Sequence, residues 1–299
     1  GVSNGFSAAI INPFTVGVAQ GIAEVPMFSG IGLRIVIWAV TMALVIWYTM
    51  RYAARVKAKP ELSIVKGIDF PLIANIDKNE IIEAPFTTKH KITMLAFVLT
   101  IVILVYGTIK LGWYIDELSA LFIITMLVLG LINGFSFSKI ASVFIEGSSQ
   151  VVFGAFVIGI ARAVLLILQD GCIIDSVVYY LAQSVASFST YVAAEMMFIV
   201  QTLLNFFIPS GSGQAAASMP IMVPLSDLVG VNRQIAVLAF QFGDGFSNQF
   251  WPASICCDLA IAGIPLDRWY KFYIPIGILL LIMQFVFMAI AVAINYGPI

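Results

Sequence analysis

A short run of small polar residues, Pro209-Ser-Gly-Ser-Gly-Gln214, has the composition of a ligand-binding loop. It lies between two apolar runs, Tyr191–Ile208 and Ala215–Val229, and each is short for a full membrane crossing, which takes about 20 residues. Two half-length helices that meet at such a tip are typical of a re-entrant hairpin. The open N–H groups, the hydroxyls and the positive end of the second helix favour an anion or a small polar ligand. An ordinary surface turn between two helices is the alternative.

Asp244 is the titratable residue with the clearest functional meaning, because it stands in an apolar segment that we expect to lie in the membrane. Intramembrane carboxylates are costly and usually mark ion or proton pathways. Asp244 could bind a cationic substrate group, a coupling Na⁺ or a proton. A structural ion pair with a neighbouring Arg or Lys is the alternative. Asp258 and Glu195 are candidates of second rank.

The surroundings of Asp244 repeat an earlier part of the chain. Asn4-Gly-Phe-Ser7 recurs as Asp244-Gly-Phe-Ser247, and a proline follows each copy, Pro13 before Thr15 and Pro252 before Ser254. Prolines in spanning helices free backbone carbonyls, and paired breaks in two repeats surround one midplane site in many carriers.

The repeat also supplies uncharged side-chain oxygens that suit Na⁺ or a polar ligand. They are Ser7, Asn12 and Thr15 in the first copy and Ser247, Asn248 and Ser254 in the second. We expect a possible Na⁺ site near Ser7, Asn12, Ser247 and Asn248. Hydrogen bonding between packed helices is the alternative for any one of these residues.

The composition is that of a polytopic membrane protein. The chain is 61% hydrophobic and 10% charged, whereas soluble chains average about 25% charged residues. A net charge of −1 gives no basic surface for nucleic acid. The one histidine and three cysteines show no spacing typical of a metal or catalytic site, so we expect no enzyme and no cofactor beyond a coupling Na⁺ or H⁺.

The hydropathy pattern predicts an all-α fold of transmembrane helices in the cell inner membrane. The loop 51–91 holds eight of the fifteen Lys and Arg residues and is therefore predicted to be cytoplasmic. Residues 134–150 are predicted to form a surface arm before a span at 151–168, and whether 170–187 crosses is left open. The predicted parts are a broken helix (1–30), a span (31–50), the loop (51–91), scaffold and arm helices (92–169), a second transport region (170–264) with a hairpin (191–229) and a broken helix (232–264), and a last span (265–299).

The number of spans sets the relation between the two copies. With four full crossings between them, the repeats are inverted, as in many secondary carriers; a crossing at 170–187 would make them parallel. Nothing corresponding to the hairpin precedes the first copy. We therefore expect this chain to be the C-terminal part of a carrier whose first half is largely missing.

Three segments resemble the YfcC-type branch of the anaerobic C4-dicarboxylate carrier family. They are the runs Asn205–Gly230 and Gln234–Asn248, with Asn12–Ala23 as a first-half counterpart. The resemblance implies the ion transporter superfamily, with inverted repeats, re-entrant hairpins, broken helices, a homodimer and elevator-like movement of a transport domain. It implies substrates among dicarboxylates, other organic anions or basic amino acids. Carried over by position, it implies substrate and ion contacts at Ser210, Gly211, Ser212, Gly213, Asn12, Thr15, Asn248 and Ser254.

One departure concerns the second break, where the family commonly has a Pro-Thr-Ser-like run and this chain has Pro252-Ala-Ser254. The role of Ser254 is therefore less secure. The leading hypothesis is a secondary active transporter of a small carboxylate or amino acid, coupled to Na⁺ or H⁺ or working by exchange. The alternative is a non-transporting membrane subunit, or a split half that functions only with a partner chain.

Overall fold

The computed structural model describes residues 2–68, 85–113, 115–185 and 187–297. Every regular element in those ranges is a helix, which confirms the predicted all-α class. The chain divides into two compact units, residues 1–67 with 153–299 and residues 68–152. Residues 69–84 of the predicted cytoplasmic loop lie outside the described ranges.

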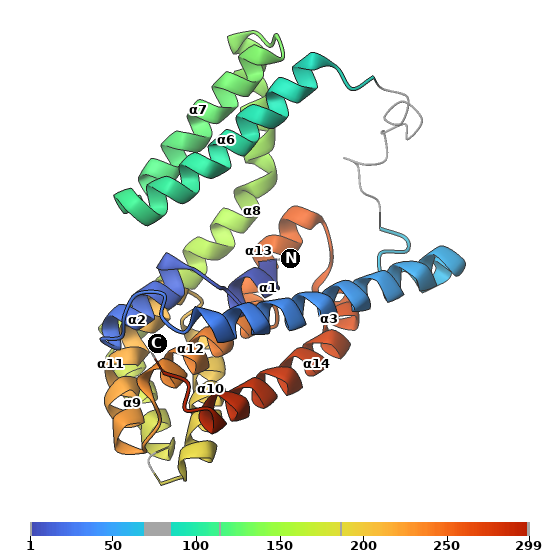
Figure 1. Ribbon diagram of the computed structural model, residues 1–299. Helices are drawn as coiled ribbons and strands as arrows, with labels where there is room; N and C mark the ends of the chain where they lie inside the picture. Colours follow the sequence, from blue (N-terminus) through green and yellow to red (C-terminus); the bar gives the residue numbers. More distant parts are fainter. Residues whose placement is uncertain (1, 69–84, 114, 186, 298–299) are drawn as a thin grey trace. The chain divides into compact units, whose positions relative to one another are not determined.

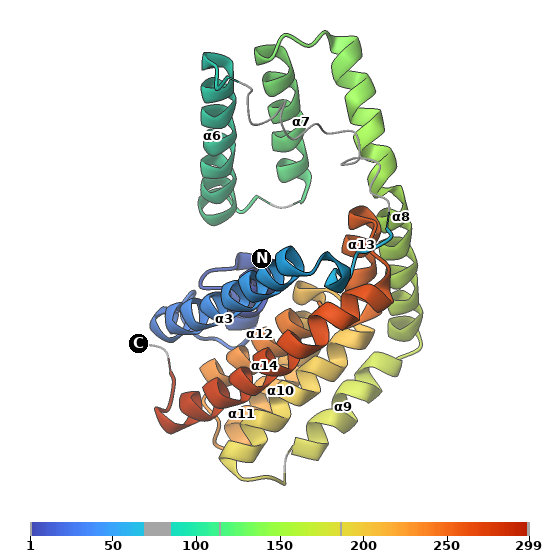
Figure 2. The same ribbon diagram turned by 90° about the vertical axis from the view of Figure 1, so that its right-hand side faces the viewer.

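The larger unit holds the hairpin and both predicted breaks (Figures 1 and 2). Its elements are α1 (Val2–Ser7), the π-helix η1 (Pro13–Gly17), α2 (Val18–Ile22), α3 (Ile31–Ala58), the 3₁₀ turn η2 (Pro60–Leu62), α9 (Ile173–Val185), α10 (Thr190–Phe207), α11 (Gly211–Leu228), α12 (Arg233–Ser247), α13 (Pro252–Ala262) and α14 (Leu266–Ala293).

The smaller unit pairs α6 (Thr88–Leu111) with α7 (Ile115–Ile132), which lie side by side. Their hydroxyls join across the interface, Thr100 Oγ1 lying 3.0 Å from Thr125 Oγ1. Asn133 Nδ2 donates to Thr93 Oγ1 at 3.0 Å. Such bonds between apolar helices are typical of membrane packing.

One long helix, α8 (Phe137–Asp170), replaces the predicted surface arm at 134–150 and separate span at 151–168. The helix continues through the predicted boundary at residues 150 and 151, and the surface position of residues 134–150 stays a prediction. No proline interrupts this stretch, and its polar residues bond within the helix: Ser142 Oγ donates to the Lys139 carbonyl and Ser149 Oγ to that of Glu146. Hydroxyls satisfied in this way leave the helix unbroken.

Four helices of the described chain are long and apolar enough to cross a membrane. They are α3, residues Thr88–Thr108 of α6, α10 and α14. Helix α10 meets this criterion by itself, without α11. Its length therefore does not decide between a re-entrant segment and a full crossing. The predicted clean span at 31–50 contains Arg34, which is buried at 1% exposure and whose Nη2 donates to the Ser29 carbonyl at 2.8 Å.

Helix α12 forms the centre of the larger unit, and all its residues from Gln234 to Ser247 are buried. It packs against α1, α10, α11 and α14. Two glycines permit this: a Cβ on Gly243 would lie 2.7 Å from the Thr202 backbone N, and one on Gly245 only 2.3 Å from Ser7 Cα. The helix is therefore held between two neighbouring backbones at the level of Asp244.

Both predicted breaks coincide with helix ends. Helix α12 ends at Ser247 and α13 begins with Pro252 at its first position, while α1 ends at Ser7 and η1 begins with Pro13. Proline suits the first turn of a helix because it has no N–H to lose there. The sequence repeat thus corresponds to a repeated order of helix, irregular segment and proline-led helix.

Candidate functional site

The Gly/Ser run forms the tip of a helical hairpin between α10 and α11 (Figure 1). Ser210 is the N-cap of α11, and its Oγ accepts a hydrogen bond from Gly213 N at 3.4 Å. Ser210, Gly211, Ser212 and Gly213 are all half-buried. The tip therefore offers a helix N-terminus that is partly covered by protein.

At Gly211 the hairpin tip packs closely against both copies of the repeat. A Cβ placed on it would lie 2.5 Å from Thr15 Cγ2 in η1 and 3.0 Å from Asp244 Oδ2 in α12. Only glycine fits at this distance, since real Cβ atoms do not approach other atoms so closely. The structure thus brings together three of the predicted site residues, Gly211, Thr15 and Asp244.

Asp244 is buried at 1% exposure and incompletely paired. Its Oδ1 accepts a hydrogen bond from Asn205 Nδ2 at 2.8 Å, and the Asn248 side chain also interacts with the carboxylate, whereas the geometry leaves Oδ2 without a hydrogen-bond partner. None of the ion pairs found among the described residues includes Asp244, so they do not provide the Arg or Lys of the alternative interpretation. A buried carboxylate in this state has unmet capacity for a cation or a proton.

Two further oxygens near Asp244 also lack partners. They are Thr15 Oγ1 and Asn205 Oδ1, both buried. An unsatisfied buried polar group costs about 1–3 kcal/mol. Three such oxygens on residues that adjoin the hairpin tip are consistent with a site that a ligand completes.

A network of buried amides supports the hairpin, and the sequence interpretation missed it. Gln214 Nε2 donates to the Gln201 carbonyl and to Gln201 Oε1, both at 2.8 Å, and its Oε1 accepts from Asn205 Nδ2 at 3.1 Å. Ser218 Oγ lies 3.1 Å from Gln201 Oε1. The signal was present: Gln201 and Asn205, and likewise Gln214 and Ser218, are four residues apart and therefore share a helix face.

The asparagines at the two breaks bond locally. Asn12 Oδ1 caps η1 by accepting from Phe14 N at 2.9 Å, and Asn248 Oδ1 accepts from Ser254 Oγ at 2.9 Å. Ser254 thus keeps a partner at the break despite the departure from the family pattern. Ser7 lies where α1 crosses Gly245, and Ser247 Oγ donates to the Gly243 carbonyl. A Na⁺ site near Ser7, Asn12, Ser247 and Asn248 stays a prediction.

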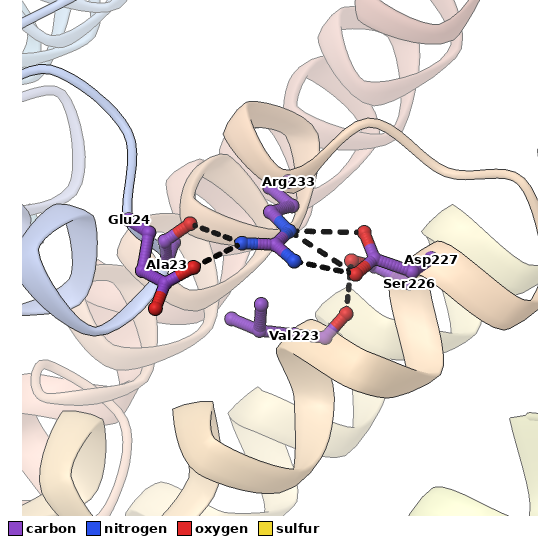
Figure 3. Close-up of polar contacts among 6 residues, drawn as sticks. All are labelled: Ala23, Glu24, Val223, Ser226, Asp227 and Arg233. Carbon is purple, nitrogen blue, oxygen red and sulfur yellow. Dashed lines mark hydrogen bonds and ion pairs between the residues drawn. The ribbon is translucent and has the colours of Figure 1, made fainter.

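The opposite end of α12 carries an exposed ion-pair cluster (Figure 3). The Arg233 guanidinium lies 2.8 Å from Asp227 Oδ2 and 3.0 Å from Glu24 Oε2, and its Nη1 also donates to the Ala23 carbonyl at 3.2 Å. Hydrogen bonds from Arg233 lower the pKa of Asp227, and those carboxylates raise the pKa of Arg233. This cluster joins the first repeat to the base of the hairpin.

A second, buried network lies beside it and is made of amides. Gln234 Oε1 accepts from Ser29 Oγ at 3.0 Å and from Gln20 Nε2 at 3.3 Å, and Gln234 Nε2 donates to the Ser29 carbonyl at 3.2 Å. These bonds connect α12 with α2, more than 200 residues away in the chain.

Comparison with known proteins places the chain in a carrier family. Residues 1–293 match the family described as C4-dicarboxylate anaerobic carrier (DcuC). The chain is 37% identical over 301 residues, 96% of its length, to an Escherichia coli protein named "putative basic amino acid antiporter YfcC". It is 33% identical over 286 residues, 94% of its length, to an uncharacterized protein of Haemophilus influenzae. No solved structure matches.

The chain spans 58% and 56% of the lengths of these two relatives. The prediction that it is the C-terminal part of a carrier is not supported, because the family match covers nearly the whole chain. The described helices and the match over residues 1–293 show that this is a membrane protein and a member of the C4-dicarboxylate anaerobic carrier family.

Proposed function

We propose that this protein is a secondary active transporter of a small organic ion, and that the substrate or its coupling cation binds where the hairpin tip meets Asp244. One observation carries the proposal: the buried Asp244 Oδ2 lacks a partner at the point where Gly211 and Thr15 converge. Carriers with broken helices place their ligands among such helix ends. Ser210, Ser212, Gly213, Asn12, Asn248 and Ser254 would complete the site.

A basic amino acid is the substrate class that this chemistry favours. The Asp244 carboxylate, whose Oδ2 has no partner, attracts an ammonium or guanidinium group. A relative that matches over most of the chain is named "putative basic amino acid antiporter YfcC". A basic amino acid would place its cationic group at Asp244 and its carboxylate at the N–H groups of α11.

A C4-dicarboxylate is the second candidate, favoured by the description of the family. A dianion next to an ionised Asp244 would be repelled, so this substrate requires Na⁺ or H⁺ on the same carboxylate. The identity of the substrate thus determines whether a coupling Na⁺ or H⁺ is needed at Asp244. For a basic amino acid, exchange needs no further cation at Asp244.

The remaining features of the proposal follow from the family pattern and from charge. Alternating access would be of the elevator type, in a homodimer, with the multi-pass chain in the inner membrane. The lysines and arginines of loop 51–91 favour a cytoplasmic position for that loop. The smaller unit of α6, α7 and the first part of α8 would belong to the scaffold.

Transport in proteoliposomes tests this proposal. The natural full-length protein is reconstituted and assayed with arginine, ornithine, succinate and fumarate, under imposed Na⁺ and pH gradients and with each substrate inside for exchange. Asp244→Asn keeps the volume and removes the charge. We expect uptake of at least one substrate, with a loss of about 10- to 100-fold in the variant, since hydrogen bonds to charged groups contribute about 1.5–3 kcal/mol.

Asp267→Asn is the matched control, because Asp267 is 66% exposed at the start of α14 and lies near Arg268 and Lys271. Wild-type transport by Asp244→Asn would refute the assignment of the site. A pure protein that transports none of the substrates, but gains activity on addition of a partner chain, would favour the alternative of a non-transporting subunit.

A further inference from the structure

A cavity away from the hairpin tip has the lining of a cation site. It encloses about 380 Å³ between α3, α13 and α14, within the range of roughly 300–1,000 Å³ typical of small-molecule sites. Aromatic rings form much of its wall: Tyr48, Trp269, Phe272 and Tyr273. The rings of Trp269 and Tyr273 are stacked with centroids 5.4 Å apart, and Tyr48 meets Phe272 edge to face at 5.3 Å.

The polar atoms of these rings are already engaged with backbone carbonyls. Trp269 Nε1 donates to Gln249 at 3.0 Å, Tyr48 Oη to Phe272 at 2.8 Å and Tyr273 Oη to Phe246 at 3.2 Å. The rings therefore line the cavity with carbon atoms rather than with unused hydrogen-bond donors. Aromatic faces attract cations through the ring quadrupole.

Asp258 supplies the one formal charge among the residues that line the cavity. Asp258 is exposed, and no ion pair found among the described residues includes it; Arg268 and Lys271 lie beside Asp267. The other polar lining residues, Thr49 and Gln249, are uncharged. A carboxylate and several aromatic rings with no lysine or arginine make a site that selects for positive charge.

We infer that this cavity binds an organic cation, a guanidinium or ammonium group on an aliphatic stem, with the charged end at Asp258. The cavity adjoins the second break, because Trp269 bonds to Gln249 in the irregular segment between α12 and α13. Bound there, a cationic substrate would occupy an access site next to the transport site. This role as an access site rests on the proposed function, whereas the binding itself does not.

The test uses the natural full-length protein in nanodiscs and radiolabelled agmatine, which has a guanidinium and an ammonium group but no carboxylate. Butylurea serves as a neutral competitor of similar shape and succinate as an anionic one. We expect saturable agmatine binding that quenches tryptophan fluorescence and that neither competitor displaces. Asp258→Asn should weaken this binding about fivefold, the size expected for a partly exposed charge contact. Asp267→Asn should leave it unchanged.

Two further variants identify the site. Trp269→Phe keeps an aromatic ring and should remove the fluorescence signal while radioligand binding persists. Asp244→Asn should lower transport about 10- to 100-fold and leave the quenching of Trp269 by agmatine intact, because Trp269 lines the cavity. Quenching that is lost in Asp244→Asn but kept in Asp258→Asn would overturn the inference, as would displacement by butylurea, which would indicate an interfacial aromatic anchor. Agmatine binding with no transport of any substrate would contradict the proposed function alone.

Discussion

The charged residues at the two ends of α12 differ in burial and in pairing. At its start, Arg233 is about one-third exposed and lies within 3.0 Å of carboxylate oxygens of both Asp227 and Glu24. Near its end, Asp244 is buried and one of its oxygens has no partner. Water would have solvated the Arg233 guanidinium at little cost, yet it is fully paired. The buried Asp244 carboxylate has the greater need of partners, yet its Oδ2 has none. This difference supports the proposal that the Arg233 end stabilises the position of the helix and that a ligand binds at the Asp244 end.

The same contrast holds for the backbone. Near Asp244 two glycines allow α10 and α1 to approach α12 so closely that a Cβ would collide with either neighbour. At the other end, a Cβ on Gly230 would meet only Thr190 Oγ1, at 3.6 Å. The Asp244 carboxylate thus lies between two glycines at close backbone contacts, whereas the glycine before α12 has room for a Cβ.

The largest effect on stability should come from adding a side chain at Gly245, where α1 packs closely on α12. Gly245→Val adds atoms at a position where the first carbon already lies 2.3 Å from Ser7 Cα. Because the neighbouring atom belongs to the backbone, it cannot move aside as a side chain can. We expect the free energy of unfolding to fall by at least about 3 kcal/mol and transport to be lost. The midpoint of thermal unfolding in detergent measures the effect.

Gly32→Ala is the control for that variant, because nothing lies within 4 Å of its added Cβ in α3. It should leave the unfolding midpoint unchanged or slightly higher, since alanine favours helix. Equal tolerance of both changes would show that α1 does not pack on Gly245 as the structure has it.

The next effect concerns the hydrogen bond that Asp244 Oδ1 accepts from Asn205. Asn205→Ala removes the Nδ2 donor 2.8 Å away and leaves the carboxylate less stabilised when ionised. We expect the substrate concentration for half-maximal uptake to rise about tenfold, a change of about 1.4 kcal/mol. Asn205→Ser keeps a small donor and should recover part of the loss. An unchanged uptake curve in Asn205→Ala would separate Asp244 from substrate binding.

A smaller effect is expected within the hairpin itself. Gln214→Leu keeps the bulk of the side chain and removes its two bonds to Gln201 and its bond to Asn205. Leaving buried polar groups unpaired costs about 1–3 kcal/mol, which thermal unfolding would register. Ala216→Ser, on the exposed face of the same helix, is the matched control. A loss of transport at unchanged stability would instead place Gln214 in the ligand site.

The sequence was sufficient for the features that are local in the chain. The hairpin tip followed from two glycines and two serines between apolar runs, the breaks from proline after a repeated motif, and Asp244 from a charge among apolar residues. Each of these patterns spans a few residues and has one physical cause. The continuity of α8 through residues 150 and 151 has a local cause too, because the serine hydroxyls of its polar stretch bond to carbonyls of the same helix.

What the sequence could not provide are pairings between distant residues. Asn205 reaches Asp244 across 39 positions, and Gln234 reaches Ser29 across 205. These contacts depend on how helices cross, which the periodicity of one helix does not determine. Arg34 shows the limit most clearly: it occupies a stretch that is otherwise apolar, and only the packed structure shows that it is buried.

The smallest predicted effect on stability concerns Arg233, at the start of α12. Arg233→Gln removes ion pairs that are largely exposed, and such pairs contribute little, so we expect the unfolding midpoint to fall by no more than a few degrees. The pH dependence gives the sharper measurement. Because Arg233 lowers the pKa of Asp227, this carboxylate stabilises the folded state above its ordinary pKa of about 3.9. That contribution is lost as the pH falls through the lowered pKa of the folded state.

The difference in unfolding midpoint between wild type and Asp227→Asn should therefore be constant near neutral pH and vanish in acid. It should also shrink in high salt, which screens exposed charges. If Arg233→Gln instead destabilised the protein as strongly as Gln214→Leu and did so at every salt concentration, the guanidinium would behave as a buried group. The contrast between the two ends of α12 would then fail, and with it the argument that only the Asp244 end is kept open for a ligand.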